Sequence, residues 1–165
     1  MGNEPSFSTP YLYNLLGAPW KTQKIMRTLL NAFFTDDLHG IPGDEDGGGM
    51  TAWVVLSMMG FYPVTPGSPV YVLGSPVFDR VTLRLETGKT FKLIARNNSA
   101  DNKYIQSVKL NGQTLNRIWF RHADIANGGT IELQMGNTPN LALGTTPETL
   151  PPCSAAIDPQ SLAKP

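Results

Sequence analysis

The spacing of the apolar residues changes near residues 60–63, and this change constrains the fold more than any other feature of the sequence. From Thr9 to about Gly60 apolar residues recur at helical spacing. After Pro63 short runs rich in Val, Leu, Ile, Phe and Tyr are separated by Gly, Asn and Pro. Helices followed by strands predict an α+β fold. The expected parts are a helical segment over 1–66, an antiparallel β region packed on it over 67–136, and an irregular, extended or disordered tail over 137–165.

Three helices are expected before the change. Pro10 opens a short helix that Gly17 closes, and Pro19 begins an amphipathic helix reaching about Phe34. Its apolar stripe is predicted to hold Ile25, Met26, Leu29, Leu30, Phe33 and Phe34, with Lys21, Lys24 and Arg27 elsewhere. The run 50–59 is apolar on almost all sides, which describes a buried helix or a long core strand, and its Ala, Leu and Met residues favour the helix. Such a helix needs cover on every side, so neighbours beyond these elements are expected.

Five strands are expected after the change, and an antiparallel sheet is the economical arrangement for them. Asn111-Gly112 is the best hairpin turn, because both residues adopt the left-handed conformation that a tight hairpin requires. The predicted strands are Val70–Leu73, Val81–Leu85, Phe91–Ala95, Tyr104–Leu110 and Thr130–Met135.

Composition limits the classes of partner. Thirteen basic and thirteen acidic residues cancel, and only 16% of the 165 residues are charged. No overall field therefore favours nucleic acid or an anionic membrane, and a neutral ligand such as a carbohydrate suits the balance. No apolar run approaches the roughly 18 residues of a membrane span, and no signal peptide is recognised, so the sequence indicates no compartment.

Two smaller features bear on the covalent chemistry of the chain. Cys153 is the single cysteine, which excludes an internal disulfide and a cysteine-based zinc site. Asn97-Asn98-Ser99 has the pattern of an N-glycosylation sequon, which matters only in a secretory setting.

The stretch "GIPGDEDGGGMTAW" at 40–53 sets three acids beside three glycines. As a calcium loop of EF-hand type it fails, because Val55 stands where the closing acid belongs. As a phosphate cradle it fails too, since the acids repel phosphate and no Lys follows. Two interpretations stay open: the acids cap the helix that begins near Met50, or Asp44 and Asp46 face a ligand and polarise a water molecule.

A second polar motif, "GNEP" at 2–5, places Asn3 and Glu4 before a proline that restricts Glu4 to extended geometry. Amide and carboxylate oxygens suit a hard cation or a sugar diol. By itself this motif is weak.

Taken together and in order, three stretches resemble the C-terminal part of glycoside hydrolase family 92, the exo-acting α-mannosidases. They are "GNEPSFSTPYLYN", "PWKTQ" and "GIPGDEDGGGMTAWVVLSMMGFYPVTPGSPVYVLGSPVFD", with weaker similarity through to "IELQMGNTPN". The resemblance implies calcium-dependent hydrolysis of terminal α-linked mannose with inversion at the anomeric carbon. It also implies an N-terminal β-sandwich and an (α/α)6 barrel, of which this chain holds the last helices and the strands that follow.

The resemblance assigns roles residue by residue. Asp46 is the expected base that activates water, with Asp44 as its partner, and Asn3 and Glu4 are expected near Ca²⁺ and the terminal sugar. The substrate contacts expected are Glu4, Glu45, Tyr13 and Trp20. Trp20 stands at a helix entry, where its ring can stack on a sugar or staple the helix end. Tyr13 is placed nearer the pocket, because Tyr11 and Tyr13 cannot both face inward on one helix.

Departures from the family pattern concern the pocket and the general acid. Gly49 stands where the family has Gln, and Ser6-Phe7-Ser8 replaces a motif that commonly carries histidine. The family's general acid lies in an upstream portion that these residues do not include, so the chain is expected to need the missing sandwich and barrel portion as well as its mannose-containing glycan. The alternative expectation is a noncatalytic carbohydrate-binding or structural remnant.

Overall fold

Helices occupy the first third of the chain in the computed structural model, which describes residues 2–152. Two short 3₁₀ turns, η1 (Glu4–Ser6) and η2 (Thr9–Tyr11), lead into α1 (Leu12–Leu15). The longer helices are α2 (Pro19–Phe33) and α3 (Gly49–Met59). All three helices predicted from the sequence are present, and the apolar run 50–59 is helical.

The remaining elements form two sheets. A three-stranded antiparallel sheet has the order β1-β2-β7, and a five-stranded sheet has the order β3-β4-β8-β5-β6. The strands are β1 (Phe61–Tyr62), β2 (Val70–Leu73), β3 (Arg80–Arg84), β4 (Thr90–Arg96), β5 (Tyr104–Leu110), β6 (Gln113–Leu115), β7 (Trp119–Arg121) and β8 (Gly129–Gly136). Two further 3₁₀ turns are η3 (His122–Asp124) and η4 (Pro147–Thr149).

The five predicted strands are confirmed to within a residue or two at their ends. The Asn111-Gly112 turn is also confirmed, since it joins β5 to β6 with φ angles of 50° and 83°. The prediction of a wholly antiparallel region is wrong at one place, because β8 lies between β4 and β5 and runs parallel to β4. The last strand, β8, enters the middle of the sheet between β4 and β5, which run in opposite directions. It is antiparallel to β5 and therefore parallel to β4.

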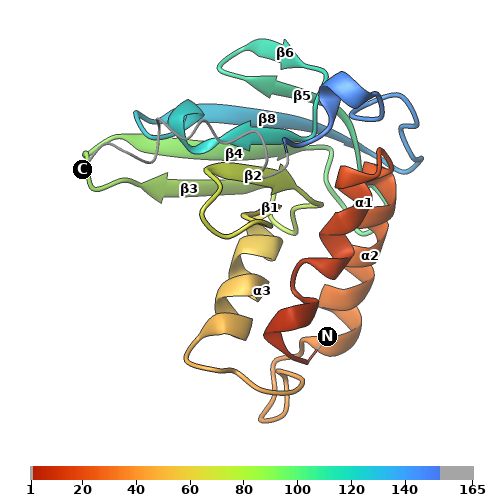
Figure 1. Cartoon of the computed structure of the whole chain (residues 1–165), viewed down its shortest axis with the longest axis vertical. Coiled ribbons are helices and arrows are strands. Elements are labelled where there is room, and N and C mark those ends of the chain that lie inside the picture. The colour runs from red at the N-terminus through yellow and green to blue at the C-terminus, as the bar shows by residue number, and fades with distance from the viewer. Residues whose placement is uncertain (1, 153–165) are drawn as a thin grey trace.

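The three-stranded sheet lies between the helices and the five-stranded sheet (Figure 1). Its side chains alternate between two apolar clusters, as strand geometry requires. Phe61 and Leu73 belong to the cluster on the five-stranded sheet, whereas Val72 belongs to the helical cluster and Tyr62 packs against it. The fold is therefore α+β, with two apolar clusters that share one thin central sheet.

Helix α2 faces the sheets with a mixed rather than an apolar surface. Arg27, expected away from the buried stripe, is only 8% exposed, and Phe33, expected within it, is 48% exposed. The buried face meets backbone groups that need partners: Gln23 accepts a hydrogen bond from the Ile105 N–H at 3.0 Å, and the Arg27 guanidinium donates to Ser75 Oγ and to the Pro76 carbonyl.

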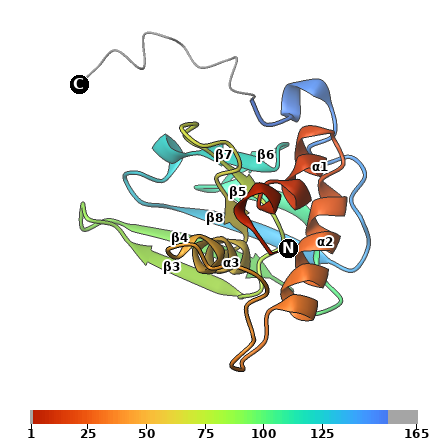
Figure 2. The ribbon, with the colours of Figure 1, turned by 60° about the horizontal axis from the view of Figure 1, so that its bottom comes forward.

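Helix α3 contributes to both clusters but is not covered on all sides. Met50 and Trp53 are fully buried, and Leu56 and Met59 pack against the cluster on the five-stranded sheet. Val55 on the same helix is 48% exposed. In Figure 2, α3 is seen almost end-on and is drawn over β3 and β4, with α1 and α2 to one side. Part of the cover expected for this helix is thus absent from the described residues.

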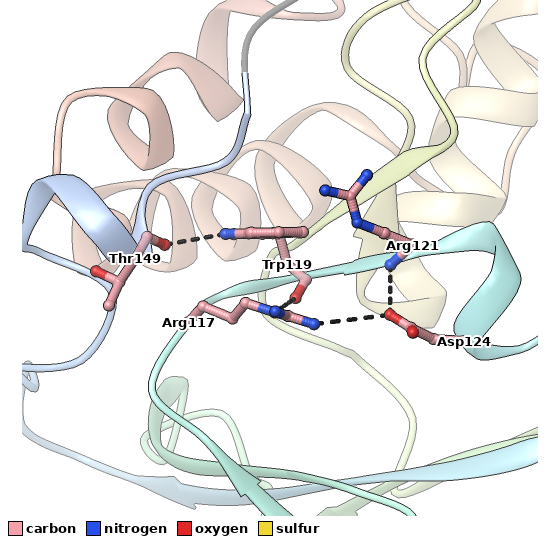
Figure 3. A network of polar contacts seen from close by, with 5 residues as sticks. All are labelled: Arg117, Trp119, Arg121, Asp124 and Thr149. Carbon is pink, nitrogen blue, oxygen red and sulfur yellow. Dashed lines mark hydrogen bonds and ion pairs between the residues drawn. The ribbon is translucent and has the colours of Figure 1, made fainter. Parts of the chain in front are cut away.

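The segment after β8 packs against β7 through Trp119 (Figure 3). The Trp119 indole N–H donates to the Thr149 carbonyl at 3.0 Å, and the Arg117 guanidinium lies 4.2 Å from the centre of the indole ring system. Asp124 accepts a hydrogen bond from the Arg121 N–H at 2.8 Å and pairs with Arg117 at 3.7 Å. Residues 137–152 of the expected tail are described, whereas residues 153–165, including Cys153, lie outside the described part. Within 2–152, no helix combines the length and apolarity that crossing a membrane requires.

Candidate active site at the acidic loop

The acidic loop, residues 34–48, joins α2 to α3 at the end of the helix layer away from the sheets (Figure 1). The first residues of the chain lie against it, because the Asp44 N–H donates to the Gly2 carbonyl at 3.2 Å. Two motifs separated by about forty residues in the sequence are thereby brought side by side. Asn3 and Glu4 come from η1 and its cap, and Asp44, Glu45 and Asp46 come from the loop.

Glycines give the end of this loop its shape. Asp46, Gly47 and Gly48 are consecutive left-handed residues, with φ angles of 45°, 69° and 98°. Such a run strains most side chains by about 1–2 kcal/mol per residue, and Asp tolerates it better than most because its short side chain can hydrogen-bond locally. The reversal lets α3 begin immediately after the acids.

Each of the two interpretations, helix capping and ligand contact, fits different acids of the loop. Glu45 caps the helix, since both of its carboxylate oxygens lie 3.2 Å from the Thr51 N–H and its carbonyl accepts from the Met50 N–H at 3.3 Å. Asp44 and Asp46 are exposed, and no group within residues 2–152 hydrogen-bonds to either carboxylate or forms an ion pair with it. Their oxygens are open to a ligand.

The Glu4 carboxylate lies at the start of α3, next to the acidic loop. Its Oε1 is buried and has no hydrogen-bond partner among the described residues. A buried carboxylate oxygen without a donor is unfavourable, and a cation or a ligand hydroxyl would satisfy it. A Cβ on Gly49 would lie only 3.2 Å from this oxygen, so the glycine leaves the Glu4 carboxylate room at the start of α3.

An aromatic pair holds the two motifs together. The Trp53 indole N–H donates to the Phe7 carbonyl at 3.0 Å, and the Phe7 and Trp53 rings stack with centres 5.9 Å apart. The Phe34 ring also packs on Trp53, with ring centres 5.8 Å apart. Sequence reasoning missed the role of Phe7, because 46 residues separate it from Trp53 and no local pattern links them.

The donor atoms suit calcium but do not complete a site. Asn3 and Glu4 offer amide and carboxylate oxygens, the ligands that Ca²⁺ prefers. The Asn3 Oδ1 also accepts the Glu4 N–H at 3.0 Å, where it caps η1. Within 2–152 there is no group of three or more His, Cys, Asp or Glu side chains placed to hold a metal ion. Only part of a calcium coordination shell can come from these residues.

The two aromatic candidates lie apart from the loop. Tyr13 is in α1, where the Lys21 ammonium stands 5.6 Å from its ring centre, and Trp20 is the second residue of α2. Since an α-helix rises about 1.5 Å per residue, Trp20 lies roughly 20 Å from the start of the loop at the other end of α2. The structure does not bring these rings to the acids, and their contact with substrate stays a prediction.

The hydrogen-bonded start of the loop is independent of the acids at its end. Asp37 accepts hydrogen bonds from the Thr35 hydroxyl at 2.7 Å and from the His39 N–H at 2.8 Å. These two bonds hold the pKa of the Asp37 carboxyl below its usual value.

Comparison with known proteins points to one family. The model of the glycosyl hydrolase family 92 catalytic domain matches residues 1–137. An "uncharacterized secreted glycosidase" from Arthroderma benhamiae is 38% identical over 161 residues, which cover 94% of this chain and 20% of that protein.

Solved structures are similar over the same region. The family GH92 alpha-mannosidase BT3965 from Bacteroides thetaiotaomicron, in complex with mannoimidazole, has a TM-score of 0.89 at 35% identity, over 93% of this chain and 20% of that one. The family GH92 inverting mannosidase BT2199 from Bacteroides thetaiotaomicron VPI-5482 has a TM-score of 0.86 at 44% identity, over 92% and 20%. The chain thus spans about a fifth of the length of these relatives.

Proposed function

The chain belongs to glycosyl hydrolase family 92, and from that membership we propose that it is the C-terminal part of an inverting, calcium-dependent α-mannosidase that removes terminal α-mannose from glycans. Its helices α1 to α3 are then the last helices of an (α/α)6 barrel. The neighbours that match over its length are named as an alpha-mannosidase and an inverting mannosidase.

One observation carries the proposal: two exposed carboxylates, Asp44 and Asp46, flank a third acid, Glu45, that is fully engaged in capping α3. The cap fixes the backbone on which the two free acids stand. A fixed pair of open carboxylates can hold a water molecule and accept its proton.

In the proposed reaction Asp46 takes a proton from water as the water attacks the anomeric carbon, and Asp44 supports it. Inverting glycosidases keep their two catalytic carboxyl groups roughly 6.5–9.5 Å apart, which leaves room for that water. The general acid that protonates the leaving oxygen comes from the upstream portion of the protein.

Calcium, when bound, supplies coordination of neighbouring sugar hydroxyls. Glu4 and Asn3 are the residues of this chain that would hold it, with the remaining ligands from elsewhere in the whole protein. The buried Oε1 of Glu4, which has no hydrogen-bond partner within residues 2–152, supports this assignment.

The place of action is proposed from the relative named as a secreted glycosidase. We expect the whole protein to pass through a secretory compartment and to meet its mannose-containing glycan outside the cell.

The test uses this chain together with the N-terminal portion of the whole protein, assayed on a synthetic α-mannoside with calcium present. Asp46→Asn should lower kcat by about 10²–10⁴, the usual contribution of a general base. Asp101→Asn is the matched control, an exposed acid in the turn before β5, and should leave kcat unchanged.

Either of two results would contradict the proposal. Full turnover in Asp46→Asn would remove the base from this position. Absence of hydrolysis in the assembled wild type would favour the noncatalytic carbohydrate-binding or structural alternative.

A further inference from the structure

We propose that Asn97 is the acceptor of an N-linked glycan when the chain passes through a secretory compartment. The secretory route rests on the proposed function, but the acceptor site is argued from other residues. Asn97-Asn98-Ser99 is the single Asn-X-Ser/Thr triplet in the 165 residues.

The backbone presents Asn97 outward. It follows the last residue of β4 and has a left-handed φ of 59°, so the chain turns at this residue instead of continuing the sheet. Its side chain is exposed, and so is that of Ser99. An acceptor asparagine on an exposed turn is the arrangement that a bulky glycan needs.

Hydrogen bonds distinguish Asn97 from its neighbour Asn98. The Asn98 amide donates to the Val77 carbonyl at 3.1 Å, and its Oδ1 accepts from the buried Arg27 guanidinium. Arg27 also donates to the Ser99 carbonyl at 3.4 Å. The turn is therefore fixed to α2 through Asn98 and Ser99, and Asn97 is the asparagine left on the outside.

Within residues 2–152 the Asn97 side chain makes one hydrogen bond, and modification leaves that bond possible. Its Nδ2 donates to the Met135 carbonyl at 3.3 Å. An amide nitrogen carries two hydrogens, and attachment of a sugar replaces one of them. The second hydrogen can continue to donate to Met135, so a glycan does not require this turn to unfold.

The surroundings suit a sugar. An open hollow of about 380 Å³ adjoins Asn97, and its polar lining includes Asp79, Arg80 and Arg96. Arg96 is held by Glu132 through an ion pair of 2.6 Å. Figure 1 shows the turn after β4 beside α2, whereas the acidic loop lies beyond the end of that helix. The attachment point of the glycan is therefore separate from the candidate active site.

The co-reactant is a lipid diphosphate-linked oligosaccharide. The bond that forms joins Asn97 Nδ2 to C1 of the first sugar. The bond that breaks joins C1 to the diphosphate oxygen, which leaves with the electron pair, and the amide nitrogen loses one proton.

The experiment is secretory expression of the full chain, with an added signal peptide, in a eukaryotic host, followed by treatment with an amidase that releases N-glycans. We expect slower gel migration that the enzyme abolishes, with Asn97 converted to aspartate in the peptide map. Asn97→Gln and Ser99→Ala should each abolish the slower form, whereas Ser99→Thr should keep it.

A positive control makes a negative result decisive. Gln113→Thr turns the exposed triplet 111–113 at the β5–β6 turn into a sequon and tests whether this chain meets the glycosylating enzyme. A glycan on Gln113→Thr at residue 111 but none at Asn97 would overturn the proposal. The result does not depend on mannoside hydrolysis, so it stands or fails separately from the proposed activity.

Discussion

At the scale of residues, buried polar groups with distant partners determine how the helices attach to the sheets. Arg27 is the clearest case, since its guanidinium donates to Ser75 Oγ at 3.0 Å and to oxygens of Pro76 and Asn98. Burial lowers the pKa of this guanidinium, and the negative charge of Asp79 opposes that effect. No carboxylate pairs with Arg27 directly among the described residues, so all of its hydrogen bonds go to neutral acceptors.

Replacing Arg27 tests this attachment. Arg27→Met keeps much of the side-chain volume but leaves buried oxygens without donors, and we expect the free energy of unfolding to fall by roughly 2–3 kcal/mol. Urea denaturation measures it. The control Lys24→Ala, on the exposed face of α2, should change it by less than about 0.5 kcal/mol. Equal losses in both variants would show that the Arg27 hydrogen bonds contribute nothing.

Tyr11 and Ser57 make a buried pair with a pH signature. Tyr11 is fully buried, its hydroxyl is 2.9 Å from Ser57 Oγ, and burial raises its pKa well above the ordinary value of 10.0. Burial also raises the pKa of Tyr62, whose ring stacks on Tyr11 at 5.3 Å. The unfolded chain therefore releases phenolic protons at a lower pH than the folded chain does.

The sign of the pH dependence follows by linkage. The contribution of Tyr11 is complete below about pH 10 and is lost as the pH rises further, because only the unfolded state deprotonates there. Tyr11→Phe should make this alkaline loss shallower, while costing about 1 kcal/mol at neutral pH through the missing hydrogen bond. Ser57→Ala, which keeps the phenol, should retain the loss. The free energy of unfolding of both variants is measured at several pH values. If its slope against pH in the alkaline range is the same in Tyr11→Phe as in the wild type, Tyr11 is not the source of the pH dependence.

The same scale shows what local sequence can predict about the site. The acids at 44–46 belong to one motif, and that motif predicted two alternatives for them, capping of α3 and contact with a ligand. The left-handed turn at 46–48 determines which of the three acids caps α3. The glycines of the motif allow this turn, but the motif does not specify it. The tie from Phe7 to Trp53 and the bonds of Arg27 join residues 46 to 72 positions apart, so no window of sequence contains them.

At the scale of elements, helices and strands with a strong apolar periodicity could be predicted from the sequence, whereas the pairing of the strands could not. The helices and the five longer strands have apolar patterns that span several residues, whereas β1, β6 and β7 have two or three residues each and no usable period. The parallel pairing of β4 with β8 also escaped prediction, because a strand's own residues do not specify which neighbour it meets.

The junction between α3 and β1 offers a test at this scale. Gly60 ends α3 with a φ of 100°, and a Cβ there would lie 2.7 Å from the Cβ of Pro76. Gly67 has a φ of 77°, but no described atom lies within 4 Å of its Cβ position. Both alanine variants suffer backbone strain of about 1–2 kcal/mol, and only Gly60→Ala adds a steric overlap that costs about 1–3 kcal/mol more.

Thermal and urea unfolding of the two variants measure the difference. A larger loss for Gly60→Ala than for Gly67→Ala is expected. Equal losses would mean that Pro76 moves away without cost and that the junction is not tightly packed.

At the scale of the whole molecule, the sequence predicted that α3 needs cover on every side, and residues 2–152 leave part of this helix exposed. The apolar run 50–59 predicted a helix surrounded on all sides, and Val55 is 48% exposed. Other large apolar side chains are exposed on the helix layer and loops, among them Leu12, Leu16, Phe33, Leu38 and Ile41. The layering of two sheets could not be predicted, because it depends on contacts between residues far apart in the chain.

The central sheet leads to a prediction about the whole chain. Leu73 and Val72 are adjacent in β2 and almost fully buried, but they belong to different clusters, Leu73 to the one on the five-stranded sheet and Val72 to the helical one. A loss of packing in either cluster therefore destabilises the same strand, β2. We expect the two clusters to unfold together, as small domains usually do.

Leu73→Ala should reduce the free energy of unfolding by about 2–5 kcal/mol. In a background in which Trp20 and Trp119 are replaced by Phe, tryptophan fluorescence reports on Trp53 in the helical cluster. The loss should appear equally in that signal and in far-ultraviolet circular dichroism, which reports on both layers. Val72→Ala, which removes less volume, should shift both signals together by a smaller amount. If Leu73→Ala instead separates the two signals into distinct transitions, the helices and the five-stranded sheet fold independently, and the thin sheet between them does not couple the site to the rest of the chain.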